Sequence, residues 1–182
     1  SIGILADKVG SGISLMLISL IEHNKSPPQR DTYWTGSRFI SIKSSNTSIS
    51  TKYINTNLLL IPHKLIPQWI DFFKYAPNLK LKTYKDHIDE SNINTFDDIK
   101  DIDVMIVSCT KSNSFFKKFK NIKWTRIIID EADTIQLATN TEIMASFIWL
   151  VTATPKSLRY SNKLYLKEIF KNMAPWVFNY LI

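Results

Sequence analysis

The sequence predicts an α/β domain in which helices cover both faces of a mainly parallel sheet. Five short apolar runs are rich in aliphatic residues and do not alternate strictly with polar ones, which is typical of strands buried on both faces. Stretches with helical spacing lie between them, and strands that alternate with helices indicate a parallel sheet. The five runs cover residues 2–5, 58–61, 104–107, 127–129 and 147–151.

The helical stretches define where functional loops should lie. Apolar residues recur with helical spacing at 15–21, 65–76, 115–119 and 164–173. In open parallel sheets the working groups sit in the loops at the carboxyl ends of the strands. We therefore expect the functional residues directly after the apolar runs.

The domain organisation follows from length and local composition. The 182 residues fit one domain or a large lobe, which we place at 1–155. A polar stretch at about 24–57 is too long for an ordinary loop, and we expect an insertion holding a small hairpin around 39–42 and 49–54. The acidic residues 85–103 are expected to form a solvated connection. Residues 156–182 are expected to form a C-terminal helical extension with an aromatic end.

The composition excludes several classes of protein. With 45% hydrophobic residues the chain is no disordered tail, and its single cysteine excludes a disulfide framework and a multi-cysteine zinc site. The apolar runs are too short for a membrane span, so we expect an intracellular protein, cytoplasmic or nuclear, with no membrane partner. A net charge of +7 suits a polyanionic partner. Because Ile, Lys and Asn make 58 of the 182 residues, as in AT-rich genomes, this charge alone is weak evidence.

The loop after the first run has the features of a phosphate site. Gly10 and Gly12 stand between an expected strand and an expected helix. Glycines there let backbone N–H groups converge on a phosphate at a helix N-terminus, and the Ser14 hydroxyl is placed to ligate Mg²⁺. The lysine that precedes this hydroxyl in a strict P-loop is replaced by Ile13. Two glycines in a tight turn explain the same residues without a ligand, so this signal is weak by itself.

An acidic loop follows the fourth run. Asp130 and Glu131 come directly after residues 127–129, and Asp133 follows them. In a P-loop enzyme the first carboxylate holds Mg²⁺ and the second orients or deprotonates the attacking water. Acidic residues that merely favour a helix N-terminus are the alternative.

Together these motifs resemble those of superfamily 2 helicases and translocases, most closely the Snf2-type proteins. Residues 3–14 resemble motif I, usually Gly-Ile-Leu-Ala-Asp-Glu-Met-Gly-Leu-Gly-Lys-Thr. Residues 58–69, with Pro62 and the pair Gln68-Trp69, resemble motif Ia and its helix. Residues 104–110, 124–133 and 152–155 resemble the next strand with its Ser/Thr loop, motif II and motif III. The resemblance covers about 2–155, and the insertion and composition are similar to members from large DNA viruses.

The resemblance implies a RecA-like, P-loop NTPase lobe that binds ATP and Mg²⁺ and moves on DNA or RNA. It implies a second RecA-like lobe, in cis or in trans, and allows other protein subunits as partners. Residues 156–182 would then be an extension or the start of the link to that second lobe. For a viral member, virion-associated is a third expected location, as an alternative to cytoplasmic or nuclear.

The implied roles carry over position by position. Asp130 would hold the metal together with Ser14, and Glu131 would activate water. The phosphate loop would comprise Asp7, Lys8, Val9, Gly10, Ser11, Gly12, Ile13 and Ser14. The nucleic-acid backbone would lie near Pro62, His63, Lys64, Ser108 and Thr110. The coupling between the nucleotide-bound state and nucleic-acid binding would depend on Thr152, Ala153 and Thr154.

Ile13 is the main departure from the motif. An apolar side chain cannot neutralise the β- and γ-phosphates, and the loss of such a contact costs ~3–5 kcal/mol by analogy with a buried charge pair. That corresponds to roughly two to four orders of magnitude in rate. Lys8 precedes the glycines, and we expect its side chain to point elsewhere.

Two functions therefore remain open. The first is the ATP-binding lobe of a nucleic-acid-dependent ATPase, weak or inactive alone, and Glu131 favours it. The second is an inactive pseudo-ATPase lobe that serves as a binding or scaffolding module in a transcription, replication or packaging assembly, and Ile13 favours it. An unrelated α/β enzyme is a remote third, because the sequence suggests no Ser-His-Asp or Cys-His arrangement and Cys109 is expected to be a packed or loop thiol.

Overall fold

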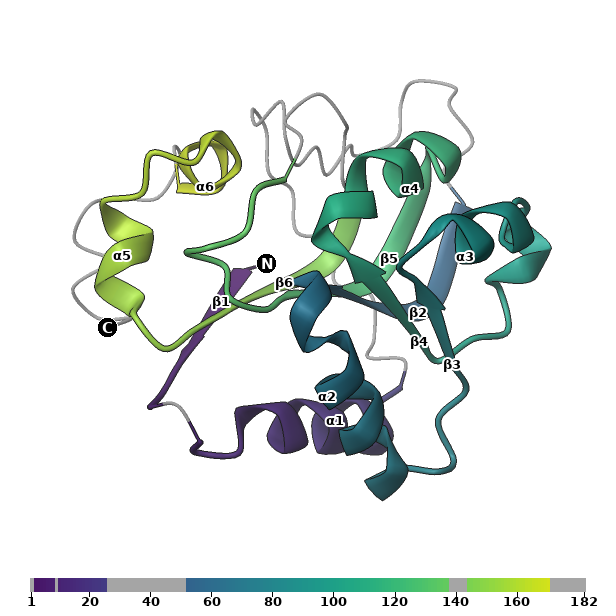
Figure 1. The fold of residues 1–182 in the computed structure, drawn as a ribbon, viewed down its shortest axis with the longest axis horizontal. Helices are drawn as coiled ribbons and strands as arrows, with labels where there is room; N and C mark the ends of the chain where they lie inside the picture. Colours follow the sequence, from purple (N-terminus) through teal and green to yellow (C-terminus); the bar gives the residue numbers. More distant parts are fainter. Residues whose placement is uncertain (1, 9, 26–51, 138–143, 171–182) are drawn as a thin grey trace.

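The computed structural model describes residues 2–8, 10–25, 52–137 and 144–170. Six parallel strands form one sheet in the order β1-β6-β5-β2-β4-β3 (Figure 1). The strands are β1 (Ile2–Ala6), β2 (Lys52–Ile61), β3 (Leu81–Tyr84), β4 (Val104–Ser108), β5 (Ile122–Ile129) and β6 (Met144–Thr152). Each of the five apolar runs lies in one of these strands, and the predicted fold class is confirmed.

Helices cover both faces of the sheet (Figure 1). Two of them, α1 (Ile13–His23) and α2 (Ile66–Phe72), pack on one face, and α3 (His87–Asn92) and α4 (Ser112–Lys118) lie on the other. The last two, α5 (Pro155–Arg159) and α6 (Leu164–Phe170), share the core of α4. Short 3-10 helices, η1 (His63–Leu65), η2 (Phe73–Tyr75), η3 (Phe96–Asp98) and η4 (Cys109–Lys111), complete the connections.

The sheet separates two hydrophobic cores. Strand β2 supplies both: Leu58 and Leu60 face the core of α4, whereas Leu59 and Ile61 face the core of α1 and α2. Successive side chains of a strand point to opposite faces, so a central strand buried on both faces reads as a continuous apolar run. Within the described residues, no helix is both long and apolar enough to cross a membrane.

The acidic segment after residue 84 is not a solvated connection, and that expectation was wrong. It forms α3 and η3 and buries Ile93, Ile99 and Ile102 in the core of α4. Two of its carboxylates bind backbone N–H groups: Asp86 accepts hydrogen bonds from the first turn of α3, and Asp98 forms a capping box with Thr95. Such caps satisfy the free N–H groups at a helix start. The edge strand β3 precedes this segment and was not predicted.

The second arm of the expected hairpin also needs correction. Residues 52–54 belong to β2, where they pair in parallel with β5, so they extend the main sheet. A register shift between Ile54 and Asn57 divides this part from the rest of β2. The first arm at 39–42 lies outside the described residues, as does the aromatic end with Trp176, Phe178 and Tyr180.

Candidate nucleotide site

The loop between β1 and α1 is built on two glycines with left-handed backbone. Gly10 and Gly12 both have φ of 86°, a region that side chains with a Cβ avoid, and Gly12 is the N-cap of α1. The N–H of Ser11 donates to the carbonyl of Lys8 over 3.1 Å and closes the turn. A Cβ built on either glycine meets nothing within 4 Å, so the space beside the loop is open.

Asp130 follows β5, and its carboxylate is held from two sides. Trp69 Nε1 on α2 donates to Asp130 Oδ2 over 2.8 Å, and the N–H of Glu131 donates to Oδ1 over 3.0 Å. Burial raises the pKa of Asp130, while both hydrogen bonds lower it. The indole therefore favours the ionised carboxylate, which is the form that binds a cation.

Glu131 has a strained backbone in the same loop. Its φ is 51°, which is uncommon for a residue with a side chain. Its carbonyl accepts from the N–H groups of Thr134 and Ile135, so a tight turn holds this conformation. Burial, followed by the negative charges of Asp130 and Asp133, raises the pKa of Glu131, and Lys64 opposes the rise. A carboxylate with a raised pKa is a better general base near neutral pH.

These loops line one cavity of about 450 Å³. The phosphate-loop residues that line it are Asp7, Lys8, Gly10, Ser11, Gly12, Ile13 and Ser14. Across from them lie Asp130, Glu131, Thr152 and Ala153, all at the carboxyl ends of β5 and β6. The remaining wall is formed by Leu15, Leu65, Gln68, Trp69, Phe72 and Val151. The structure thus gathers most of the residues expected to bind nucleotide; Val9 lies outside the described residues.

Asp133 links the acidic loop to the end of β6. Its Oδ1 accepts from Thr152 Oγ1 over 2.5 Å, and its Oδ2 accepts from Thr154 Oγ1 over 2.6 Å. Carboxylate hydrogen bonds this short are strong, so the two loops are tied together. Thr154 itself does not line the cavity. It is connected to the lining residue Thr152 by a hydrogen bond from its N–H to Thr152 Oγ1 and by their shared partner Asp133.

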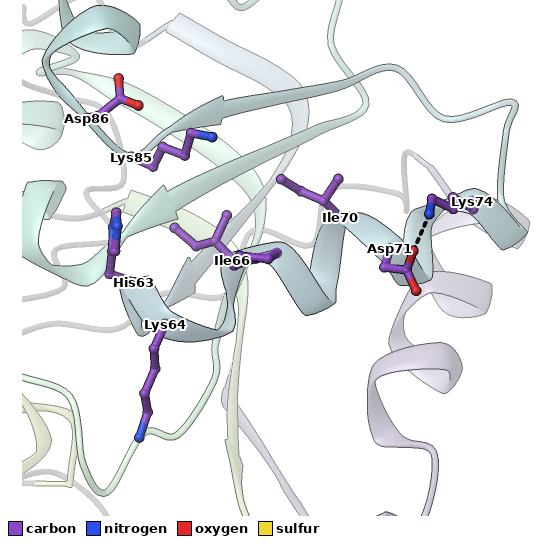
Figure 2. A pocket seen from close by; sticks show the side chains of 9 residues that line it. His63, Lys64, Ile66, Ile70, Asp71, Lys74, Lys85 and Asp86 are labelled. Atoms are coloured by element: carbon purple, nitrogen blue, oxygen red, sulfur yellow. Dashed lines mark hydrogen bonds and ion pairs between the residues drawn. The ribbon is translucent and has the colours of Figure 1, made fainter.

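The residues expected at a nucleic-acid backbone divide into exposed and buried ones. His63 and Lys64 in η1 are exposed and line a second cavity of about 610 Å³, and Thr110 in η4 is exposed as well. In Figure 2 Lys64 points away from Lys85 and Asp86. This direction agrees with the effect of its charge on Glu131, whose pKa Lys64 lowers. Asp86 lines the same cavity, and its pKa is lowered mainly by the hydrogen bond from the Asp89 N–H, with a smaller contribution from His63.

Pro62 and Ser108 differ from the three exposed residues in burial. Both are buried, and the Ser108 hydroxyl shares a 2.8 Å hydrogen bond with Thr110 Oγ1. They lie where the neighbouring strands β2 and β4 end, so they shape the loops that carry His63, Lys64 and Thr110. That they lie near a nucleic-acid backbone stays a prediction.

Sequence reasoning missed two groups that the tertiary structure brings to the site. Trp69 stood out only as part of a helix motif, because its hydrogen bond to a residue 61 positions away leaves no local signal. Asp133 was seen in the acidic loop without a partner. Both have polar atoms that need hydrogen bonds once partly buried, and this requirement is the signal that could have pointed to them.

Comparison with known proteins adds the family. A model of the SNF2-related domain matches residues 1–166. The chain belongs to the SNF2-related domain family. The resemblance inferred from the motifs is thereby confirmed, and the chain is a helicase-like SNF2 lobe.

Two individual proteins similar to this SNF2-related lobe are 30% and 18% identical to it in sequence. A protein of Acanthamoeba polyphaga mimivirus named "Putative helicase R592" is 30% identical over 234 residues, a match that covers 89% of this chain. The lobe spans only 27% of that relative. Among solved structures, the Sulfolobus solfataricus SWI2/SNF2 ATPase core in complex with dsDNA has a TM-score of 0.55 at 18% identity, covering 90% of this chain and 30% of its own. This last likeness shows the shared fold.

Replacing Trp69 by Phe in the SNF2-related lobe is expected to weaken it in a pH-dependent way. Without the indole donor the pKa of Asp130 rises further, so the ionised carboxylate becomes more costly in the folded state. The free energy of unfolding should fall by about 2 kcal/mol at neutral pH. That loss should shrink as the pH is lowered through the raised pKa of Asp130, where the carboxyl is protonated in both proteins.

Urea unfolding at several pH values measures this effect. Trp124→Phe is the matched control, because Trp124 is equally buried and donates to no carboxylate in the described part of the chain. Its loss of stability should not vary with pH. An equally flat profile for Trp69→Phe would contradict the assigned hydrogen bond.

Proposed function

We propose that this chain is the ATP-binding lobe of a nucleic-acid-dependent ATPase that moves on DNA or RNA. The observation that carries the proposal is the meeting of the Gly10–Ser14 loop and the Asp130-Glu131 pair on one cavity. Bound Mg²⁺-ATP would supply a phosphoanhydride bond whose hydrolysis drives movement. The lobe would work with a second RecA-like lobe in the whole protein.

The residues present fit this ligand. The open space beside Gly10 and Gly12 admits an anion close to backbone N–H groups at the start of α1. Ser14 and Asp130 would hold Mg²⁺ with a hydroxyl and a carboxylate oxygen, the ligand types that this ion prefers. Glu131 would accept a proton from the attacking water, for which its raised pKa is suited.

The proposed coupling uses the link between the two loops. Asp133 holds Thr152 and Thr154 in place, so a shift of the acidic loop would move the end of β6. His63, Lys64 and Thr110 would contact phosphates of the nucleic acid, since exposed short donors and cations position a backbone without reading bases. A relative of the same fold is described in complex with dsDNA, which supports a DNA partner.

An inactive lobe that binds partners is the second candidate. Ile13 favours it, because this side chain is half-buried and packs against the core of α1 and α2. It offers no donor and no charge to a phosphate. Such a lobe would keep the fold and serve as a scaffold in a larger assembly.

Equilibrium binding of a fluorescent ATP analogue to the chain tests the proposal. We expect binding that weakens when EDTA removes Mg²⁺. Asp130→Asn should abolish this Mg²⁺ dependence, because one metal ligand loses its charge. Fluorescence anisotropy with labelled DNA and RNA would measure nucleic-acid binding. The double variant His63→Ala with Lys64→Ala should weaken that binding.

Lys117→Ala is a matched control for nucleic acid, since Lys117 is exposed on α4 away from the cavities described above. Nucleotide binding that is equal with and without Mg²⁺ would remove Ser14 and Asp130 from the site. No nucleotide binding at millimolar concentration would favour the scaffold function.

A further inference from the structure

We propose that Lys8 is the phosphate-neutralising residue of this nucleotide site, in the role that Ile13 cannot perform. The inference rests on the proposed function, because it presumes that the cavity takes a nucleotide. In this role the Lys8 ammonium would contact the triphosphate of the bound nucleotide. Lys8 was expected to point elsewhere, and the proposal departs from that expectation because Lys8 is one of the residues that line the cavity.

The charged side chains that line the cavity are mostly acidic. Three carboxylates line it, from Asp7, Asp130 and Glu131. Among the described lining residues Lys8 is the one basic side chain. A triphosphate brought to this acidic surface meets repulsion that backbone N–H groups and one divalent ion offset only in part. A lysine within reach would reduce that repulsion directly.

The geometry places Lys8 at the base of the phosphate loop. Its carbonyl accepts the Ser11 N–H over 3.1 Å and its own N–H donates to Asp7 Oδ1 over 2.7 Å, so its backbone is fixed. Its side chain is exposed, and no other described residue holds the ammonium by a hydrogen bond or an ion pair. A flexible four-carbon stem on a fixed backbone can move to meet a ligand.

Asp7 is the nearest competitor for this charge in sequence. Its carboxylate already accepts the N–H of Lys8, which reduces its need for a second partner. Because both side chains are exposed to solvent, a bond between them would be weak. A triphosphate with higher charge would compete successfully for the ammonium.

Ile13 and Lys8 both differ from the usual motif I run, and the two differences exchange the positions of the cation and the uncharged or acidic residue. The usual motif I run has Glu where Lys8 stands and Lys where Ile13 stands. Ile13 is half-buried and packs against the core of α1 and α2. The cation has moved from the first turn of α1 to the start of the loop.

Binding of ATP, ADP and AMP to the chain and its variants tests this assignment. Lys8→Gln should weaken ATP binding by roughly 10- to 100-fold, the loss of one hydrogen bond to a charged group. AMP binding should change much less, since AMP lacks the β- and γ-phosphates. Adding Ile13→Lys to Lys8→Gln should restore ATP binding, because a lysine then stands at the position where the usual motif I run has one.

Lys117→Gln is the control for an equal change of net charge and should leave binding unaltered. Thermal unfolding of each variant checks that the fold is intact. If the unchanged chain binds ATP and Lys8→Gln binds it equally well, Lys8 has no such role and the proposed function stands. If Lys8→Gln weakens ATP and AMP equally, the residue does not face the outer phosphates. If the unchanged chain binds no nucleotide, both proposals fail.

Discussion

Glu131→Gln is expected to lower ATP turnover by about 10²- to 10⁴-fold, the usual contribution of a general base. The amide keeps the shape of the side chain but cannot accept the proton of the attacking water. ATP binding should be nearly unchanged, because the phosphate loop and Asp130 remain. Turnover would be measured with nucleic acid present and with a second RecA-like lobe supplied, as the proposed function requires.

The same variant should stabilise the isolated chain at neutral pH. Burial and the charges of Asp130 and Asp133 raise the pKa of Glu131, so its ionised form costs stability in the folded state. This cost is fully present above the raised pKa, shrinks as the pH falls through it, and is gone below the ordinary carboxyl pKa, where Glu131 is protonated in both states. Gln removes the cost at neutral pH and gains nothing in acid.

Thermal unfolding across this pH range provides the check. Glu22→Gln on α1 is the matched control and should shift neither turnover nor the pH profile. An equal gain at all pH values would show that the charge of Glu131 is not the cause. Turnover that survives Glu131→Gln would assign the base to another residue.

Phe115→Ala is expected to reduce the free energy of unfolding by about 3–5 kcal/mol. Phe115 is fully buried on α4, and its ring lies 5.0 Å from that of Tyr84, 4.9 Å from Phe119 and 5.5 Å from Trp124, measured between centroids. Truncation removes these contacts and leaves a cavity that a helix on a rigid sheet cannot close.

Urea unfolding at fixed pH measures this loss. Tyr75→Ala is the control, because Tyr75 is an aromatic residue that is 75% exposed, and its change should stay within about 0.5 kcal/mol. Phe115→Leu should fall between the two. Equal effects of Phe115→Ala and Tyr75→Ala would contradict the assigned core.

Much of the fold follows from local sequence because burial on both faces leaves a local record. The runs at 58–61 and 104–107 are apolar without interruption, so they identify central strands before any contact is known. The edge strand β3 escapes this rule. It has four residues, two of them partly buried and one exposed, and its pattern differs little from a loop.

The acidic segment shows the limit of composition as a guide. Its many carboxylates suggest solvent, yet Asp86 and Asp98 cap short helices whose neighbouring isoleucines reach the core. A count of charges does not say whether a carboxylate meets water or a backbone N–H. Only the folded chain decides that, since the caps depend on where the helices start.

The sequence by itself determined five of the six strands, the family motifs and the edge of the sheet where the candidate site lies, since each is encoded within a few neighbouring residues. The tertiary structure alone decided which side chains meet there. Trp69 reaches Asp130 across 61 positions, Asp133 joins Thr152 and Thr154, and Lys8 shares a cavity with Glu131. These partners lie in or just after separate strands or, for Trp69, on α2, and their proximity results from the parallel order of the sheet, which no local pattern records.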